Sequence, residues 1–199
     1  YAGGIIEDCR FTGNSAYHGG AVSYMYNSGW EGMPIDDYSS RFTGVTLKPV
    51  YGRISNCVFE LNISVDDGAA VYIEGGMPLS VDSSLLVHNF SKKGAIYSKG
   101  ANKIIITSCT ISGNSSGEPI VTEGTNPSMT INNSIIWGNE SKNRQISLID
   151  GGISEVNYSC IEGGWQGSGL NNIDVDPGFV KNAELFVDSE GTVNYSCLH

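Results

Sequence analysis

The hexapeptide CRFTGN at residues 9–14 recurs down the chain, with a small residue first, an apolar residue third and an asparagine sixth. Its relatives are CVFELN at 57–62, SLLVHN at 84–89, CTISGN at 109–114 and SIIWGN at 134–139. Successive copies begin 48, 27, 25 and 25 residues apart. Such regular spacing is typical of a protein built from stacked repeats.

Each repeat unit alternates apolar and polar residues with a period of two, which indicates β-strands. Ile104 and Ile106 alternate, two polar residues follow, and Cys109 and Ile111 then resume the alternation. A third short apolar segment follows each asparagine, as at residues 95–97. Three short strands in about 25 residues predict an all-β, single-stranded parallel β-helix. A β-sandwich would also explain the alternation, but it leaves the recurrent asparagine unexplained.

The asparagines of the repeat are expected to stack on one another at a turn. In a β-helix, equivalent residues of successive coils lie about 4.8 Å apart, so one side-chain amide can hydrogen-bond to the next. We expect these asparagines to adopt the left-handed conformation that a turn requires. The predicted ladder consists of Asn14, Asn62, Asn89, Asn114 and Asn139.

The repeat predicts one domain over residues 1–199, with about six to seven coils, cut from a longer chain. A sixth copy keeps Val156, Ser159 and Ile161, and a seventh begins at Val193. Two segments break the period: a protruding excursion at about 24–51, which could instead be a distorted extra coil, and an irregular insertion at about 163–190. Such breaks are where functional loops are expected.

Both breaks contain candidate binding residues. The excursion places Trp30 and Tyr38 near Asp36 and Asp37, a combination that could bind a sugar ring; the alternative is that its aromatic residues cover the loop's own small core. In the second break, alternate carboxylates could bind Ca²⁺, but the segment lacks the DxDxDG pattern and the distal Glu of a dedicated calcium loop, which favours a plain turn. These weak calcium candidates are Asp174 and Asp176.

Charged residues recur nine to ten positions after the start of each repeat and should line one edge of the coil stack. The column consists of His18, Asp66, Asp67, Lys92, Lys93, Glu118 and residues 143–144. Its simplest interpretation is a solvated turn in which opposite charges alternate. The other interpretation is a row of catalytic acids and bases.

The repeat also resembles a known family. Phe11 and Asn14 followed by Gly-Gly-Ala at 19–21 resemble the repeats of chlamydial polymorphic outer-membrane proteins. More broadly, the chain is similar to bacterial right-handed parallel β-helix proteins of the pectin-lyase-like superfamily, and NIDVDPGFV at 172–180 resembles a segment of its secreted members. The resemblance implies the fold and a location outside the cell or on its surface. It leaves the activity open, because this superfamily includes lyases, hydrolases and adhesins.

A catalytic role would follow from a fainter resemblance. His18-Gly19-Gly20 and Asp66-Asp67-Gly68 resemble the His-Gly and Asp-Asp motifs of polygalacturonases. That resemblance implies catalytic roles within the set His18, Asp66, Asp67, Lys93 and Glu118. The Arg-Ile-Lys motif of those enzymes has no counterpart in this chain, and this absence favours the non-catalytic hypothesis.

The amino-acid composition limits the classes of molecule that this protein is expected to bind. The chain carries 21 Asp and Glu against 11 Lys and Arg, a net charge of −10, which disfavours nucleic acid and anionic membranes. No apolar run has the length of a membrane span. We therefore expect a structural, adhesive or glycan-binding segment whose partner is a polysaccharide or a cell-surface glycan. The alternative is a polysaccharide lyase or glycoside hydrolase acting on an acidic polysaccharide. No cofactor is implied, although Ca²⁺ is possible.

Overall fold

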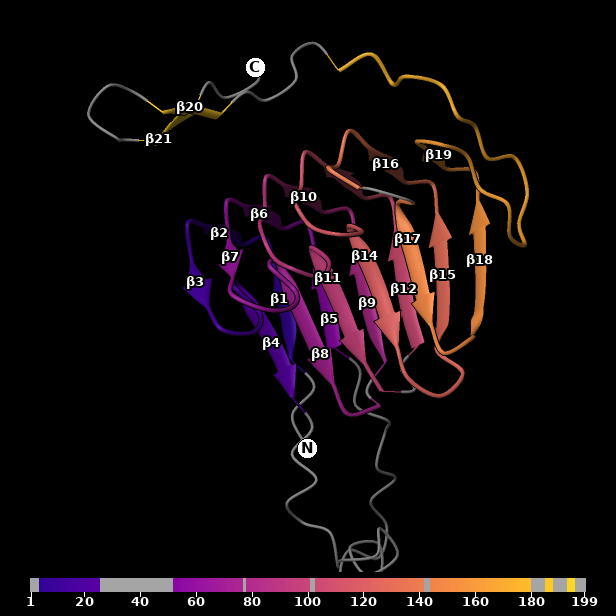
Figure 1. The fold of residues 1–199 in the computed structure, drawn as a ribbon, viewed down its shortest axis with the longest axis horizontal. Helices are drawn as coiled ribbons and strands as arrows, with labels where there is room; N and C mark the ends of the chain where they lie inside the picture. The colour runs from indigo at the N-terminus through magenta and orange to yellow at the C-terminus, as the bar shows by residue number, and fades with distance from the viewer. Residues whose placement is uncertain are drawn as a thin grey trace, which may run out of the picture.

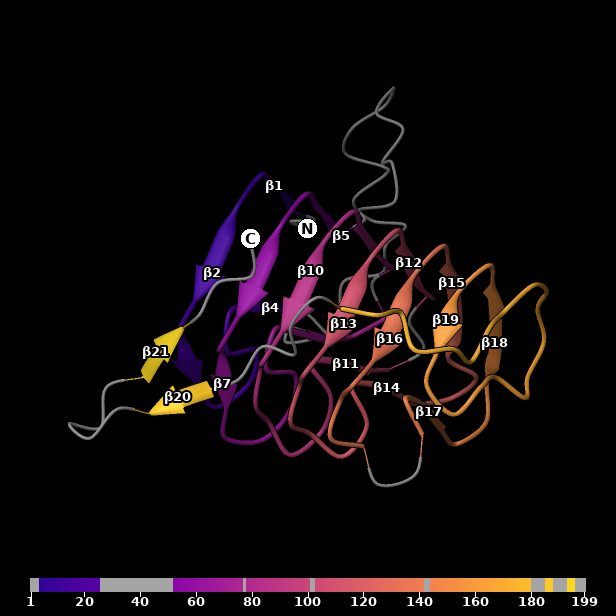
Figure 2. The same ribbon diagram turned by 90° about the horizontal axis from the view of Figure 1, so that it is seen from above.

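The computed structural model describes residues 4–25, 52–76, 78–100, 103–141, 144–179, 185–187 and 193–195. Nearly all strands in these ranges are parallel and belong to three sheets that wind around one core. Figure 1 shows the coils stacked from the indigo N-terminal end to the orange end, and Figure 2 shows the same succession from above. The predicted parallel β-helix is confirmed.

Each sheet takes one strand from each successive coil. The first sheet contains β1 (Ile5–Glu7), β5 (Gly52–Ser55), β9 (Leu79–Asp82), β12 (Lys103–Thr107), β15 (Ser128–Asn132) and β18 (Ile153–Asn157). The second contains β2 (Arg10–Thr12), β6 (Val58–Glu60), β10 (Leu85–Val87), β13 (Thr110–Ser112), β16 (Ile135–Trp137) and β19 (Cys160–Ile161). The third contains β4 (Val22–Met25), β8 (Val71–Glu74), β11 (Ile96–Lys99), β14 (Ile120–Glu123) and β17 (Ile146–Ile149). A short pair, β3 (Ser15–Ala16) and β7 (Ile63–Ser64), lies at the turn after the ladder asparagines.

The described residues form five coils with all three strands and a sixth with two, slightly fewer than the six to seven expected. The prediction that a seventh copy of the repeat begins at Val193 is wrong. β21 (Val193–Tyr195) pairs antiparallel with β20 (Leu185–Val187) and does not extend a parallel sheet. Two strands so close in sequence close a hairpin at little entropic cost, which favours local pairing over a new coil.

The first residues of the predicted excursion belong to a strand of the third sheet. Tyr24 belongs to β4, where its ring is buried and its hydroxyl donates to the carbonyl of Gly4 at 3.3 Å. The first and second coils pair directly in all three sheets, through β1–β5, β2–β6 and β4–β8. No extra coil therefore separates them. The rest of the predicted excursion, residues 26–51, lies outside the described residues. Trp30, Asp36, Asp37 and Tyr38 lie outside the described residues.

The core consists of apolar side chains stacked in register from coil to coil. In the first sheet, Val81, Ile106 and Ile131 are Cα partners in successive strands, and all three are fully buried. In the second sheet, the rings of Phe11 and Phe59 stack with centroids 5.0 Å apart. Fully burying such a side chain contributes about 1.5 to 3 kcal/mol, so every coil added to the stack stabilises its neighbour.

The bend between the first and second sheets requires one residue in the left-handed conformation. Asp8, Asn56, Ser83, Ser108, Asn133 and Tyr158 occupy this position with φ between 47° and 55°. A second left-handed residue precedes each ladder asparagine: Gly13, Leu61, His88, Gly113 and Gly138. The prediction that the asparagines themselves are left-handed is wrong. The preceding residue makes the turn, and the asparagine is thereby left free to direct its amide inward.

The five asparagines form a continuous hydrogen-bonded ladder. Along it, the Nδ2 group of each asparagine donates to Oδ1 of the next at 2.9 Å, from Asn14 through Asn62, Asn89 and Asn114 to Asn139. The same Oδ1 atoms accept the backbone N–H of the preceding asparagine at 2.9 to 3.2 Å. The ladder ends where Asn139 Nδ2 donates to Gln145 Oε1. Each buried amide thus has its hydrogen bonds made within the protein.

The small first residue of the repeat forms a second column. The backbone N–H groups of Cys57, Cys109 and Ser134 each donate to a serine Oγ of the following coil at 3.1 Å. The described cysteines are free thiols, and Cys9, unlike the others, is exposed. Burial raises the pKa of Cys109 to about 11, so this thiol stays protonated and packs as a small apolar side chain.

The irregular segment after β19 covers the edge of the last described coil. The carbonyls of Ser168, Leu170 and Ile173 accept the backbone N–H groups of Val156, Tyr158 and Ile161 at 2.9 to 3.0 Å. Edge groups that would otherwise lack partners are therefore hydrogen-bonded to a segment without regular strands.

Replacement of Asn89 by alanine tests the ladder. The change removes the acceptor of the Asn62 backbone N–H and side-chain amide, and it removes the Nδ2 donor that Asn114 Oδ1 and the Phe59 carbonyl share in this buried site. We expect a loss of about 3 kcal/mol in the free energy of unfolding, measured by urea denaturation. Asn14→Ala is the matched control: Asn14 is exposed at the first rung, so its loss should cost less than about 1 kcal/mol. Equal costs for the two variants would contradict a buried ladder.

Candidate functional site

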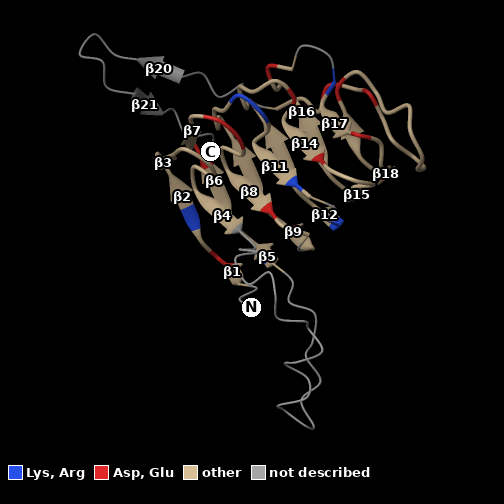
Figure 3. Ribbon diagram, turned by 60° about the horizontal axis from the view of Figure 1, so that its bottom comes forward, with Lys and Arg blue, Asp and Glu red and all other residues tan. Residues whose placement is uncertain are grey.

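The charged column lies at the turn that leads from the ladder asparagine into the third sheet. Asp67 and Lys93 are Cα partners in neighbouring coils, and the Asp67 carbonyl accepts the N–H of Gly19 at 3.2 Å, which places His18 in the same column. Gly19, Gly68 and Gly94 lie two to three residues before the third-sheet strands β4, β8 and β11, with φ between 61° and 67°. Figure 3 shows an acidic turn before β8 next to a basic turn before β11.

Behind the column, aromatic rings stack along the outer face of the third sheet. The His18 ring lies on Tyr72 with centroids 4.8 Å apart, and Tyr72 stacks on Tyr97 at 5.8 Å. Tyr17 meets His18 edge to face at 4.6 Å, and the Lys93 ammonium lies 5.2 Å from the centre of the Tyr97 ring. Tyr72 and Tyr97 are almost completely buried, so their faces are used within the protein.

A row of alternating charges runs along the carboxyl ends of the same strands. Glu74, Lys99 and Glu123 are register partners in β8, β11 and β14. Lys99 Nζ lies 3.0 Å from Glu74 Oε1, and Lys93 Nζ lies 3.5 Å from Glu123 Oε2. Figure 3 shows these strand ends as red, blue and red. The pairing keeps like charges from stacking in adjacent coils.

Each buried tyrosine donates its hydroxyl to one of these carboxylates. Tyr72 Oη lies 2.8 Å from Glu74 Oε2, and Tyr97 Oη lies 2.5 Å from Glu123 Oε2. These hydrogen bonds are the main reason that the pKa of both glutamates is lowered. Burial and the adjacent carboxylate raise the pKa of both tyrosines, so the hydroxyls remain donors.

Sequence reasoning missed this row, although the sequence contains a signal for it. VYIE at 71–74, IYSK at 96–99 and IVTE at 120–123 repeat an outward residue second and a charge fourth. Alternation within a strand places both positions on the outer face. The pattern was hidden because these strands follow the asparagine at slightly different distances.

At the first two coils the structure brings His18, Asp66 and Asp67 together. One potential metal-binding atom from each residue lies within 4.8 Å of those of the other two. Asp67 is only 7% exposed, and this burial raises the pKa of its carboxyl despite the Lys93 charge next to it. Asp66 instead pairs with Lys92, whose Nζ lies 3.5 Å from Asp66 Oδ1.

Glu118 follows in the fourth coil but is not part of this cluster. Its backbone carbonyl accepts the Ser116 hydroxyl at 3.2 Å. Lys93 lies between the cluster and Glu123. The column is therefore not one uniform catalytic row: the His and Asp residues gather at one end, and Lys93 joins the tyrosine–glutamate network.

Next to the column, four apolar side chains are exposed on successive turns. We name them the turn patch: Tyr17, Ile63, Val65 and Phe90, with exposed fractions from 46% to 62%. Ile63 and Phe90 are bridged Cα partners, and the Tyr17 carbonyl accepts the N–H of Asp66 beside Val65. The patch is thus continuous over three coils and borders Asp66 and Lys92.

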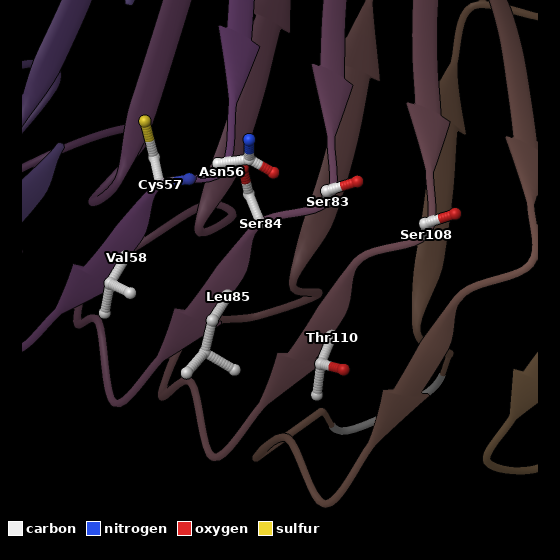
Figure 4. A pocket seen from close by; sticks show the side chains of 8 residues that line it. All are labelled: Asn56, Cys57, Val58, Ser83, Ser84, Leu85, Ser108 and Thr110. Atoms are coloured by element: carbon white, nitrogen blue, oxygen red, sulfur yellow. Dashed lines mark hydrogen bonds between the residues drawn. The ribbon is translucent and has the colours of Figure 1, made fainter. Parts of the chain in front are cut away.

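Two further features lie away from the column: the carboxylates of Asp174 and Asp176, and a hollow at a bend between sheets. Asp174 Oδ1 accepts the N–H of Gly163 and Asp176 Oδ1 accepts that of Gly178, so each carboxylate caps local backbone. An open hollow of about 350 Å³ lies at the bend between the first and second sheets. In Figure 4, its labelled side chains come from three successive coils, and Val58, Leu85 and Thr110 project from neighbouring strands. Its lining contains no charged side chain.

Removal of the Tyr97 hydroxyl tests the tyrosine–glutamate network. Tyr97→Phe should lower the free energy of unfolding by about 1 to 2 kcal/mol at pH 7, because the bond to Glu123 is charge-assisted and partly buried. Since the pKa of folded Glu123 is lowered, this stabilisation is complete above the unfolded pKa of about 4.3 and is lost as the pH falls through the folded value. Urea unfolding at pH 7 and pH 3 measures both costs. Tyr72→Phe is the control, and its loss in the free energy of unfolding should be smaller because Glu74 is more exposed than Glu123. If Tyr97→Phe lost as much free energy of unfolding at pH 3 as at pH 7, the account would be contradicted.

Comparison with known proteins agrees with the architecture. No curated protein and no solved structure matches the chain. None of the described segments is a helix with the length and hydropathy needed to cross a membrane. The family model described as "Right handed beta helix region" matches residues 43–184, more than two thirds of the chain, in keeping with the pectin-lyase-like resemblance. The chain therefore belongs to the right-handed β-helix family.

Proposed function

We propose that this protein is a secreted or cell-surface β-helix segment that binds a glycan on the turn patch. The observation that carries the proposal is the continuous exposure of Tyr17, Ile63, Val65 and Phe90 on a rigid stack of coils. Contiguous apolar surface rimmed by polar groups is a mark of interaction sites on soluble proteins. Isolated exposed apolar residues would need no such explanation.

The chemistry of the patch suits a sugar. The C–H faces of a pyranose pack on aromatic rings, and its hydroxyls need donors and acceptors at the rim. Tyr17 and Phe90 provide the rings, while Asp66 and Lys92 provide the charged groups. The net charge of −10 disfavours a strongly anionic polymer, so a neutral or weakly charged glycan fits best.

The scaffold supports a binding or structural role. Residues in register on adjacent coils are held at a spacing of about 4.8 Å by the sheet hydrogen bonds and by the asparagine ladder. A ligand that repeats along its own length can therefore contact several coils with little ordering of the protein. This property also suits an adhesive stalk.

An enzyme acting on an acidic polysaccharide is the second candidate. It is favoured by Asp67, whose buried carboxyl has a raised pKa and which lies beside Lys93 in the neighbouring coil. Such a pair could act as general acid and base. Against it, Lys93 also faces Glu123, and Glu118 lies outside the cluster of His18, Asp66 and Asp67.

The proposal is tested by measuring whether the protein binds any of a panel of neutral and uronic-acid oligosaccharides. Calorimetry then gives the affinity for each oligosaccharide that binds. We expect Tyr17→Ala and Phe90→Ala each to weaken binding about tenfold, since a lost aromatic contact is worth about 1 to 1.5 kcal/mol. Tyr158→Ala is the matched control, because Tyr158 is an equally exposed aromatic residue far from the patch. Glycan binding that resists both patch substitutions would contradict the proposal.

The same panel separates the two candidates. After prolonged incubation, unsaturated or shortened uronic-acid products that disappear in Asp67→Ala and Lys93→Ala would support the enzyme. Binding without product supports the binding segment.

A further inference from the structure

Among the described residues, few buried polar atoms lack a partner, and two of them lie close together. In the described part of the chain, the buried side-chain atoms without a hydrogen-bond partner are Asp67 Oδ1, His18 Nδ1 and Thr122 Oγ1. Asp67 and His18 both belong to the cluster with Asp66. Leaving such an atom unpaired costs about 1 to 3 kcal/mol, and more for a charged group, so each requires an explanation.

We propose that His18, Asp66 and Asp67 bind a divalent transition-metal ion of the Zn²⁺ class. One donor atom from each of the three side chains lies within 4.8 Å of the others. Because bonds from Zn²⁺ to nitrogen and oxygen are about 2.0 to 2.2 Å long, a small side-chain rotation on binding brings the three donors onto one ion. An imidazole nitrogen with two carboxylate oxygens is a ligand set that Zn²⁺ and Co²⁺ accept. The two negative charges of the aspartates balance the charge of the ion.

The surroundings hold two of these ligands in place. The His18 ring is fixed between the face of Tyr72 and the edge of Tyr17. The Asp67 backbone is fixed by the Ser64 hydroxyl, which donates to the Asp67 carbonyl at 2.8 Å, and by its pairing with Lys93. A metal site on ordered side chains loses little entropy when the ion binds.

The ligand set disfavours Ca²⁺. Calcium takes six to eight oxygen ligands, whereas this cluster offers one nitrogen and two carboxylates. Three protein ligands instead match the tetrahedral zinc sites in which water completes the coordination.

Lys92 is the competitor for this site. Its ammonium lies 3.5 Å from Asp66 Oδ1, but the side chain is 69% exposed and can turn to solvent when an ion binds. Lys93 is turned toward Glu123 and Tyr97. Replacement of Lys92 by glutamine should therefore leave metal binding at least as tight as in the wild type.

Metal titration tests the inference without a glycan, so its outcome is separate from that of the proposed function. The protein, free of any histidine tag and stripped with EDTA that is then removed, is titrated with ZnCl₂, CoCl₂ and CaCl₂ by calorimetry. We expect one equivalent of Zn²⁺ or Co²⁺ per chain and at least about tenfold weaker Ca²⁺ binding. The visible absorption of bound Co²⁺ reports low-coordinate N/O ligation directly.

Variants assign the site. Asp67→Asn and His18→Gln should each weaken Zn²⁺ binding at least about tenfold, whereas His88→Gln and Asp174→Asn should leave it unchanged. Without metal, Asp67→Asn should melt no lower than the wild type, because it removes a buried charge with an unpaired oxygen. No Zn²⁺ binding by the wild type, or full binding in both cluster variants, would overturn the inference. Weaker binding in Lys92→Gln would overturn the assignment of Asp66.

Discussion

The asparagine ladder is the interaction on which the rest of this structure depends. A β-helix must turn at every coil, and each turn directs polar backbone groups toward the core. Each asparagine amide accepts from the coil before it and donates to the next, as between Asn62 and Asn89, so these groups are paired without water. The ladder also fixes the register, because a slip of one residue would break every rung and turn the apolar side chains outward.

The fixed register explains where the polar and charged side chains of the candidate sites lie. After the asparagine, the side chains of the turns no longer pack in the core, but equivalent positions are still stacked on one another in successive coils. Polar residues there face one another over several coils, as Asp67 faces Lys93 and Glu74 faces Lys99. The turn patch and the His18 cluster are therefore consequences of the same stacking. A repeat that specifies only packing thus yields a surface on which a few substitutions can create a binding site.

Much of the fold was predictable, because residues that stack on one another in successive coils recur at a regular spacing in the sequence. Residues in a column share one environment, so Val81 and Ile106 are alike and the asparagines recur. The site was only partly predictable. The spacing of the repeats predicted that Asp67 would lie beside Lys93. The local sequence does not show that Tyr72 and Tyr97 are buried although they lie on the outer face of a sheet, nor that the Asp67 side chain is shielded from solvent. Those features depend on neighbouring coils covering one another. The antiparallel pairing of Val193–Tyr195 was missed because local pairing competes with the repeat.

Amide hydrogen exchange of the folded protein, resolved by residue, tests the central claim most directly. If the ladder holds the coils together, the backbone N–H groups of Asn62, Asn89 and Asn114, which donate to buried side-chain oxygens, should exchange only through global unfolding. Their protection should then equal that of core strand amides such as Ile106. Protection as low as that of exposed turn residues such as Gly151 would mean that the turns open independently, and would contradict the account.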